Sequence, residues 1–396
     1  MDRHSEDCVT DKTRPFRVLS LDGGGMRGTY AATYLMRLVE AFSVRRKVED
    51  LDLGRAFDLI VGTSTGAILA CALAVGVPLK TVVEFYRRRG PAVFPRPLPR
   101  TLPRFLLSGD WFLRRRALRA GTASLREALG EVFRATTIAE VHRQRQIALA
   151  ITAVDISRHQ GWVFKTPHIP GSNGRDNHYQ LVDVCLASTA APVYRSLAAI
   201  AHPDGGHSGF NVFVDGGVWA NNPVIVALVE ALNMAPPDRP IEVFCLGTCP
   251  GPAGEQIAAS AVHRNLQDWD FGGAAAALSI DAQEFAYDDV ARLLAPHFNR
   301  KCTILRFPRG QVSAALVPYL NLDDTRPEAI NALINQARSD AAMTNSRCNS
   351  PHDPDGRLIC DLFTSAPPRS ILEDQPPSNL PGAGLSTVAS EEVENV

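Results

Sequence analysis

Two apolar runs that each end in a glycine-rich turn and continue as a helical pattern restrict the fold of this chain most strongly. The runs are 16–21 and 59–61, the turns are 22–28 and 62–66, and the helical patterns are 29–44 and 67–75. Short apolar runs bounded by turn residues are typical of buried strands. A strand that returns to its sheet through a helix lies parallel to its predecessor. The chain is therefore predicted to be α/β, with a mostly parallel central sheet flanked by helices.

The remaining apolar patterns extend this sheet and its helices along the chain. Strands are predicted at 147–154, 212–214, 241–246 and 303–307, and helices at 125–133, 181–188, 223–232, 280–294 and 327–341. We expect a polar N-terminal segment over 1–15, a catalytic domain over 16–250, a helical extension packed on it over 251–364, and a tail over 365–396. The tail is rich in proline, serine, glycine and glutamate, and it is predicted to be disordered.

The composition excludes several classes of protein. A formal net charge of -1 argues against a globally basic protein that binds a nucleic-acid polymer, although it permits a local basic patch. No apolar run is long enough for a membrane span, and the N-terminus lacks the features of a secretory signal. The eight cysteines form no CxxC pair, so we expect reduced thiols and no metal site. A cytoplasmic protein with, at most, peripheral membrane contact is predicted.

The first glycine-rich turn fits two kinds of site. Gly23 to Gly28 matches the G-x-G-x-x-G pattern of a dinucleotide-binding loop, and Glu40 lies near the spacing of a ribose-binding acid. Asp22 and Arg27 would crowd a pyrophosphate, however, and a nucleotide fold leaves the second turn unexplained. Consecutive glycines also aim backbone N–H groups at one point, where they stabilise the oxyanion of acyl transfer. The oxyanion interpretation is favoured, while a nucleotide loop or a structural turn stays open.

The second turn is a candidate nucleophile elbow. Gly62-Thr63-Ser64-Thr65-Gly66 lies between a predicted strand and a predicted helix. In that context a G-x-S-x-G serine is held in a strained conformation above the sheet, and side chains at the glycine positions would collide with their neighbours. The helix N-terminus also favours a developing negative charge. Ser64 is the predicted nucleophile, and the alternative is a small-residue turn that matches by chance.

Ser64 needs a base, since an unassisted hydroxyl is a poor nucleophile. Four histidines are candidate bases: His202, His207, His263 and His297. None of them lies in a well-formed turn after a strand. Asp215 is the better candidate, because it directly follows a short predicted strand and precedes two glycines that allow close backbone approach. Its alternative role is to cap the turn before the Pro223 helix. A carboxylate base requires surroundings that raise its pKa or a geometry that compensates.

Three separated motifs resemble the patatin-like phospholipase family. Asp22 to Gly28 is similar to the family's oxyanion stretch, Gly62 to Gly66 to its nucleophile elbow, and Asp215-Gly216-Gly217 to its catalytic aspartate turn. The block Ala187 to Pro192 resembles the family's alanine- and serine-rich block. The resemblance covers Phe16 to Leu246, and it implies a three-layer sandwich that carries the nucleophile elbow.

The resemblance also implies a chemistry. A Ser64–Asp215 dyad replaces a triad, fatty acyl esters of phospholipids are hydrolysed through an acyl-enzyme, and catalysis needs no metal or other cofactor. The oxyanion donors would be the N–H groups of Gly23, Gly24, Gly25 and Thr65, and Arg27 would order their loop. An acyltransferase that uses the same dyad and a catalytically silent nucleotide-sensing module are the alternatives.

The segment 87–121 has an unusual composition. Ten arginines accompany a single acid, Asp110, over 87–119, with interleaved aromatic residues and five prolines that are expected to break any long helix. It is interpreted as a lid that meets phospholipid headgroups, as a phosphate-binding site for a cyclic dinucleotide, or as a solvated loop. Phe85 to Arg87 and Gly90 to Pro95, together with Val218 to Pro223, resemble bacterial family members, some of which are cyclic-dinucleotide-activated effectors of anti-phage CBASS systems. That resemblance implies a nucleotide activator, and a homo-oligomer is a further expectation.

Overall fold

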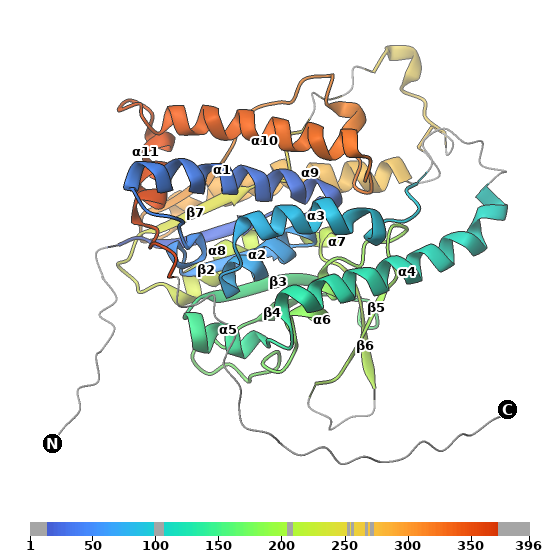
Figure 1. The fold of residues 1–396 in the computed structure, drawn as a ribbon, viewed down its shortest axis with the longest axis horizontal. Coiled ribbons are helices and arrows are strands. Elements are labelled where there is room, and N and C mark those ends of the chain that lie inside the picture. Colours follow the sequence, from blue (N-terminus) through green and yellow to red (C-terminus); the bar gives the residue numbers. More distant parts are fainter. Residues whose placement is uncertain are drawn as a thin grey trace.

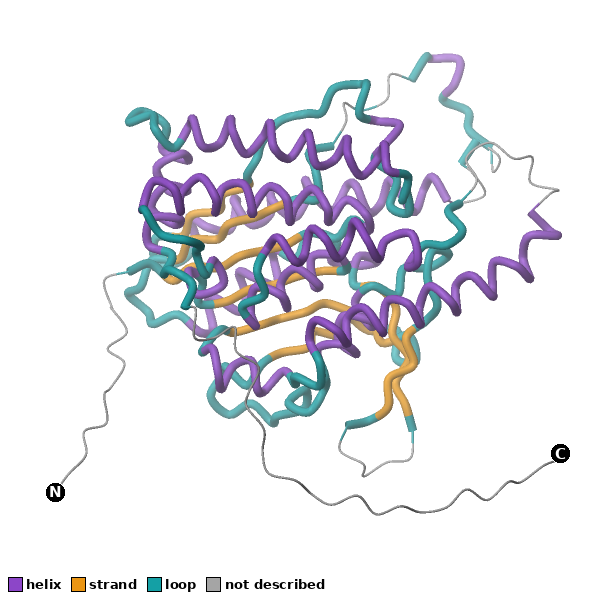
Figure 2. The backbone as a smooth tube through the Cα atoms, in the orientation of Figure 1, coloured by secondary structure: helices purple, strands orange, loops and turns teal. Residues whose placement is uncertain are grey.

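The computed structural model describes residues 14–98, 107–203, 209–251, 254, 257–265, 268–269 and 273–370, without the side chains of 107–112. Within these residues one eight-stranded sheet forms the centre, and helices cover both of its faces (Figure 1, Figure 2). The strands are β1 (Phe16–Leu21), β2 (Leu59–Thr63), β3 (Ala148–Asp155), β4 (Gln160–Lys165), β5 (Ala198–Ala201), β6 (Phe210–Asp215), β7 (Ile241–Leu246) and β8 (Cys302–Arg306). The predicted α/β architecture is confirmed.

The order of the strands brings the two glycine-rich turns together. The sheet runs β5-β6-β3-β2-β1-β7-β8, with β4 beside β3. Its five strands from β3 to β8 are parallel, whereas β4, β5 and β6 pair antiparallel. β1 and β2 are neighbours, with Leu21 opposite Gly62. Their carboxyl ends therefore leave the same edge of the sheet, where open α/β sheets place their sites.

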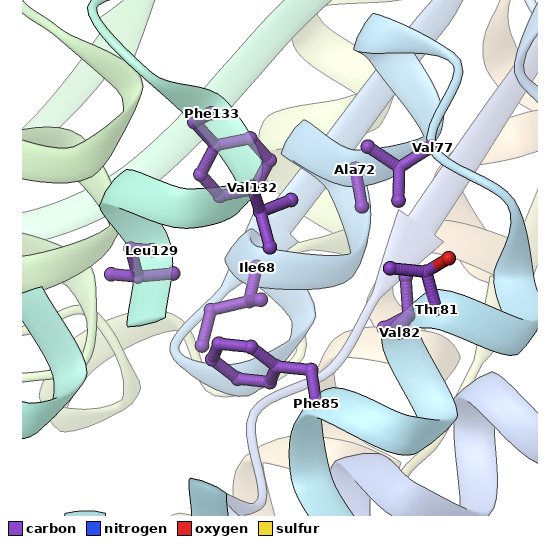
Figure 3. A pocket seen from close by; sticks show the side chains of 9 residues that line it. All are labelled: Ile68, Ala72, Val77, Thr81, Val82, Phe85, Leu129, Val132 and Phe133. Carbon is purple, nitrogen blue, oxygen red and sulfur yellow. The ribbon is translucent and has the colours of Figure 1, made fainter. Parts of the chain in front are cut away.

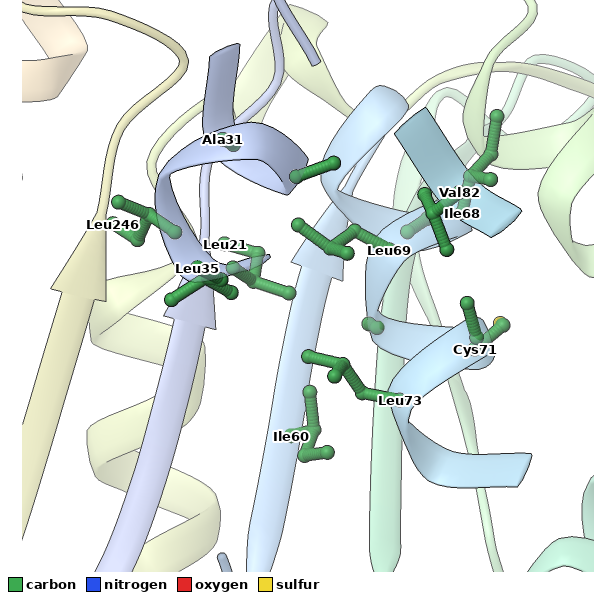
Figure 4. Close-up of a cluster of buried hydrophobic side chains, with 14 of the residues drawn as sticks. Leu21, Ala31, Leu35, Ile60, Ile68, Leu69, Cys71, Leu73, Val82 and Leu246 are labelled. Carbon is green, nitrogen blue, oxygen red and sulfur yellow. The ribbon is translucent and has the colours of Figure 1, made fainter. Parts of the chain in front are cut away.

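The helices divide between the two faces of the sheet. Their bounds are α1 (Gly28–Arg46), α2 (Thr65–Val75), α3 (Leu79–Val93), α4 (Leu107–Phe133), α5 (Ile138–Arg145), α6 (Leu181–Ser188), α7 (Gly217–Ala220), α8 (Val224–Met234), α9 (Gly273–Leu294), α10 (Pro327–Arg347) and α11 (Pro354–Ser365). α8 and the last turns of α9 pack on one face, and α1 and α2 pack on the other. Figure 4 shows Leu21, Ile60 and Leu246 of the sheet beneath side chains of α1 and α2.

Strand alternation explains why the sheet is buried on both sides. Val18 packs against the α8 layer, whereas its neighbours in the strand, Leu19 and Leu21, pack against the α1 and α2 layer. Successive side chains of a strand point to opposite faces, so a strand covered on both faces is apolar throughout, as parallel strands usually are. The largely apolar runs that predicted β1 and β2 have this cause, although Arg17 and Ser20 of β1 are also buried.

The C-terminal helices pack on α1. Tyr30 donates a hydrogen bond to Asp340 of α10 at 2.6 Å, and the ring of Phe42 stacks on that of Phe363 in α11. β8 joins the central sheet beside β7, so the part of the chain after residue 250 contributes a strand as well as helices. The proposed division into domains stays a prediction.

Two local expectations were wrong. Prolines do not keep 87–121 from forming helices: α3 continues through Pro91 to Val93, and α4 begins after the last proline of the segment. The solvated-loop interpretation therefore fails for 107–121. The tail is ordered at its start, since Arg369 pairs with Asp50 and residue 368 bridges to residue 51. Residues 371–396, like 1–13 and 99–106, lie outside the described part.

Candidate active site

Ser64 lies in a strained elbow between β2 and α2. Its backbone has φ 53° and ψ −120°, a conformation that a non-glycine residue adopts only when its surroundings enforce it. The flanking glycines are required by close approach: a Cβ on Gly62 would lie 2.5 Å from the Gly66 carbonyl oxygen, and one on Gly66 would lie 2.3 Å from the Leu21 carbonyl oxygen. The elbow therefore has the geometry that the pentapeptide predicts.

Asp215 at the end of β6 contacts Ser64 directly. The Ser64 hydroxyl donates to Asp215 Oδ2 at 2.7 Å, and the Gly217 N–H donates to Asp215 Oδ1 at 2.7 Å. Both side chains are buried, with Ser64 8% and Asp215 4% exposed. Gly216 allows the turn to approach β3, because a Cβ there would lie 2.2 Å from the Thr152 hydroxyl. Two residues 151 positions apart are thus held as a hydrogen-bonded pair.

The surroundings of Asp215 favour a proton acceptor. Burial raises the pKa of its carboxyl to about 6, while the hydrogen bonds from Ser64 and Gly217 and the charge of Arg195 act in the opposite direction. A base with a pKa near 6 is largely ionised at neutral pH and accepts a proton more readily than an ordinary aspartate does. Burial therefore supplies the raised pKa that a carboxylate base requires.

The first glycine-rich turn faces the elbow. Gly25 needs to be glycine, because its φ is +56° and a Cβ there would lie 2.3 Å from the Leu322 carbonyl oxygen. Among the described residues, the N–H groups of Gly24, Gly25 and Thr65 donate to no backbone or side-chain acceptor. These three N–H groups remain available for a ligand oxyanion. Arg27 lies in the same turn as Gly24 and Gly25, and its Nε donates to the Gly24 carbonyl at 3.4 Å.

Gly23 departs from the expected set of oxyanion donors. Its N–H donates to the Asn221 carbonyl at 2.9 Å, and its own carbonyl accepts from the Thr248 hydroxyl at 2.9 Å. Both backbone groups of Gly23 are engaged in holding the turn against its neighbours. The prediction that the Gly23 N–H binds the oxyanion is therefore wrong for this conformation, and the residue has a structural role.

One buried arginine supports the turn from beneath. Arg306 of β8 donates to Asp22 at 2.7 Å and to Asp288 of α9 at 2.5 Å. Burial raises the pKa of Asp22 to about 7, with the nearby acids Glu284 and Asp288 acting in the same direction and Arg306 against them. The guanidinium thus donates hydrogen bonds to Asp22 and to Asp288, and it connects the glycine-rich turn to α9.

α9 also holds the loop that follows Asp215. The Asn222 side chain donates to Asp288 at 2.8 Å and to the Glu284 carbonyl at 2.9 Å, and the Asn221 N–H donates to Gln283 at 3.0 Å. Both loops of the site therefore rest on the same helix. Sequence reasoning missed the α9 residues, which lie more than sixty positions after Asp215, whereas Asn221 and Asn222 belong to the stretch Val218 to Pro223 that resembles bacterial family members but was assigned no role.

Two further contacts fix the elbow. The Ser64 N–H donates to the hydroxyl of Ser188 at 2.8 Å, and the Tyr86 hydroxyl donates to the Thr65 carbonyl at 3.1 Å. Ser188 lies in the alanine- and serine-rich block that was noticed in the sequence, and that block was the signal that could have assigned it. Tyr86 lies in the stretch Phe85 to Arg87, which resembles bacterial family members, but that resemblance assigned it no role.

The histidines considered as bases lie elsewhere. His263 and His297 are exposed and His202 is half-buried, whereas His207 falls outside the described residues. The Ser64 hydroxyl has its hydrogen bond to Asp215. In the part of the chain that the structure describes, no cluster of three or more histidine, cysteine or acidic side chains could hold a metal ion.

A small apolar cavity lies behind the elbow helix, between α2, α3 and α4. Figure 3 shows its lining, in which the Thr81 hydroxyl is the one polar group drawn; the lining residues are Ile68, Ala72, Val77, Thr81, Val82, Phe85, Leu129, Val132 and Phe133. Neither Ser64 nor Asp215 lines it. We attribute the cavity to imperfect packing of three helices.

A comparison with protein families decides the classification. The model of the family described as "Patatin-like phospholipase" matches residues 19–228, more than half of the chain, and this range includes both Ser64 and Asp215. The chain belongs to the patatin-like phospholipase family. Patatin-like phospholipases are lipid acyl hydrolases, and the chain is accordingly a carboxylic ester hydrolase that acts on lipids.

Several relatives agree with this membership. A cGAMP-activated phospholipase of Pseudomonas aeruginosa is 36% identical over 70% of this chain and 74% of its own length. A protein of the same name from Vibrio cholerae is 31% identical over 57% of this chain, which spans 60% of that relative. Patatin-like protein 1 of Arabidopsis thaliana is 30% identical over 56% of this chain and 53% of its own length.

The solved structures similar to this patatin-like phospholipase are more distant. Human GIVD cytosolic phospholipase A2 has 12% identity and a TM-score of 0.43, over 89% of this chain and 60% of that chain. VipD from Legionella pneumophila has 14% identity and a TM-score of 0.36, over 83% of this chain and 66% of that chain.

Proposed function

We propose that Ser64 and Asp215 hydrolyse fatty acyl esters of phospholipids as a catalytic dyad. Asp215 takes the proton of the Ser64 hydroxyl while the oxygen attacks the ester carbonyl carbon. The resulting oxyanion accepts hydrogen bonds from the N–H groups of Gly24, Gly25 and Thr65. When the tetrahedral intermediate collapses, the lysophospholipid leaves with the proton held by Asp215, and the acyl group stays on Ser64.

The second half of the reaction uses the same groups. Asp215 takes a proton from water, the hydroxide attacks the acyl-enzyme, and a second oxyanion forms against the same N–H groups. Its collapse releases the fatty acid, and the Ser64 oxygen regains a proton from Asp215. No step in this scheme calls for a metal or another cofactor. Arg27 is assigned the role of ordering the glycine-rich turn.

The observation that carries the proposal is the 2.7 Å hydrogen bond between a strained, buried serine and a buried carboxylate. A fluorophosphonate probe should label the wild type and fail to label Ser64→Ala, and mass spectrometry should show released fatty acid for the wild type alone. Ser157→Ala, an exposed serine, is the matched control and should behave like the wild type. Labelling of Ser64→Ala at the wild-type rate contradicts the dyad. Added lysolipid that captures the acyl group would favour an acyltransferase instead.

We also propose that a cyclic dinucleotide activates the enzyme. The support is the similarity to three bacterial proteins named cGAMP-activated phospholipases, at 31–36% identity. A role in antiviral defence accompanies this proposal. Fatty acid release should rise in the presence of one member of a panel of cyclic dinucleotides and stay at its basal rate with linear dinucleotides. Equal rates with every nucleotide would argue against this regulation.

Peripheral membrane association is a third proposal. Among the described residues, no helix combines the length and the apolar character needed to cross a bilayer, while α4 exposes Arg115, Arg116 and Arg119. Exposed arginines attract anionic headgroups at a membrane surface. Liposome co-sedimentation should fall for the Arg115/Arg116/Arg119→Ala variant, and unchanged binding would oppose this role. A cytoplasmic location and a homo-oligomeric state are proposed with it, and light scattering measures the latter.

A further inference from the structure

The side chain of Asn221 lies between the two proposed catalytic residues. A Cβ on Gly23 would lie 2.3 Å from Asn221 Oδ1 and 3.3 Å from the Cβ of Ser64. A Cβ on Gly217 would lie 3.1 Å from Asn221 Oδ1 and 3.0 Å from Asp215 Oδ1. The carboxamide of Asn221 therefore fills space that the glycine at position 23 leaves open, with the nucleophile beside it in one direction and the base in another.

The backbone of Asn221 fixes the place from which this side chain extends. Its N–H donates to Gln283 of α9 at 3.0 Å, and its carbonyl accepts the Gly23 N–H at 2.9 Å. These two bonds connect Asn221 to α9 and to the glycine-rich turn. Because both use main-chain groups, a substitution of the side chain leaves them intact, and neither of them involves the carboxamide.

The carboxamide has no hydrogen-bond partner among the described residues. Asn221 is 8% exposed, and its amide atoms are not sealed off from solvent. The next residue differs: Asn222 donates to Asp288 at 2.8 Å and to the Glu284 carbonyl at 2.9 Å, and it accepts the Val224 N–H at 3.1 Å. A nearly buried amide is normally hydrogen-bonded. The unused donor and acceptor of Asn221 therefore point to a ligand.

The position of the carboxamide selects the ligand atom that it can reach. The proposed oxyanion faces the N–H groups of Gly24, Gly25 and Thr65, whereas the Asn221 carboxamide lies beside the carboxylate of Asp215. In the proposed mechanism the base gives its proton to the leaving oxygen and later takes one from water, so both oxygens occupy the same place next to the carboxylate. A carboxamide can donate to such an oxygen and accept from it.

We infer that Asn221 is a catalytic residue whose carboxamide binds the oxygen that exchanges a proton with Asp215. In the first half of the reaction this is the leaving oxygen of the lysophospholipid, and in the second half it is the oxygen of the attacking water. Asn221 forms no covalent bond and neither gains nor loses a proton; its hydrogen bond orients the oxygen toward the base. This inference rests on the proposed dyad.

Turnover and stability of Asn221→Leu test the role. Leucine has the branched shape of asparagine without its polar atoms. The kcat for phospholipid hydrolysis should fall about tenfold or more, as the loss of one hydrogen bond in the transition state predicts, while KM changes little. The midpoint of urea denaturation should stay near that of the wild type, because no hydrogen bond within the protein is lost. Asn222→Ala is the matched control and should lower this midpoint.

Fluorophosphonate labelling separates this role from damage to the dyad. When Ser64 attacks the probe, an O–P bond forms, the P–F bond breaks, fluoride leaves without a proton, and Asp215 takes the proton of the serine. This reaction uses neither a leaving oxygen nor a water molecule. Asn221→Leu should therefore label Ser64 at close to the wild-type rate although its phospholipid turnover is reduced.

Three results overturn the inference. The first is a wild-type kcat in Asn221→Leu. The second is a loss of labelling equal to the loss of turnover, because the side chain then acts through the dyad. The third is a urea midpoint that falls as far as that of Asn222→Ala, which assigns the carboxamide to structure. If the leucine variant does not fold, Asn221→Ala is judged by the same three measurements.

Failure of the dyad gives a different pattern. If Ser64 and Asp215 are not the catalytic pair, Asp215→Asn retains hydrolysis and Ser64→Ala is labelled at the wild-type rate. The inference about Asn221 fails alone when both of those variants are inactive and the Asn221 variants hydrolyse phospholipid at the wild-type rate.

Discussion

Replacement of Asp215 by asparagine should make the protein more stable while it removes activity. The carboxyl has an ordinary pKa of 3.8, which burial raises to about 6 in the folded protein. Each pKa unit corresponds to about 1.4 kcal/mol, so the ionised form lowers the free energy of unfolding by about 3 kcal/mol at neutral pH, as an order of magnitude. Asparagine is neutral at every pH, and it can still accept the Gly217 N–H and contact Ser64.

The sign of the pH dependence follows from the raised pKa. Between pH 3.8 and about 6 the Asp215 carboxyl of the folded protein holds a proton that the unfolded chain has released. The contribution of Asp215 to the free energy of unfolding is therefore complete below pH 3.8 and is lost as the pH rises through 6. The increase in the free energy of unfolding caused by Asp215→Asn should therefore be largest at pH 7 to 8 and should vanish near pH 4. Hydrolysis should fall about 10²- to 10⁴-fold through loss of the base.

Urea denaturation at pH 8 and pH 4, together with thermal unfolding, measures this effect. Asp353→Asn is a control of opposite sign, because hydrogen bonds from Arg347 lower the pKa of Asp353 to about 2, and its loss should destabilise the protein at neutral pH. A rise in Tm of a few degrees is expected for Asp215→Asn. An Asp215→Asn protein that is no more stable than the wild type at pH 8, or equally stabilised at pH 4, would refute the reasoning.

Three further predictions concern the supports of the site. Gly25→Ala should lower kcat about 10²-fold or more, since its φ of +56° and the nearby Leu322 carbonyl displace an oxyanion donor, whereas Gly130→Ala should keep the wild-type kcat. Arg306→Gln should destabilise the protein by about 3 to 5 kcal/mol by leaving buried acids without their cation, measured by urea denaturation. Ser188→Ala should lower kcat more than it changes KM, because the Ser64 N–H loses its acceptor; equal kcat values would contradict this role.

Local sequence was sufficient for the core elements of the sheet and for the identity of both candidate catalytic residues. The strands β1, β2, β3, β6, β7 and β8 were anticipated, whereas β4 and β5 were not. β5 is apolar but has only four residues, of which alternate ones are exposed, and β4 is exposed at its start, so neither has the length and burial of a strand covered on both faces. α3 was not anticipated, and it continues for two residues beyond Pro91 before it ends at Val93.

The chain by itself determined the elbow, the glycine-rich turn and the aspartate turn, because each depends on consecutive residues. The positive φ values at Ser64 and Gly25 and the close approach of Gly62 to Gly66 lie within these short stretches, whereas the approach of Gly66 to the Leu21 carbonyl is a tertiary contact. Tertiary structure alone decided which of the glycine N–H groups is already used, how far burial raises the pKa of Asp215, and which distant cations support the site. These properties arise from segments more than a hundred positions apart that share one low-dielectric interior, and no local pattern encodes that proximity.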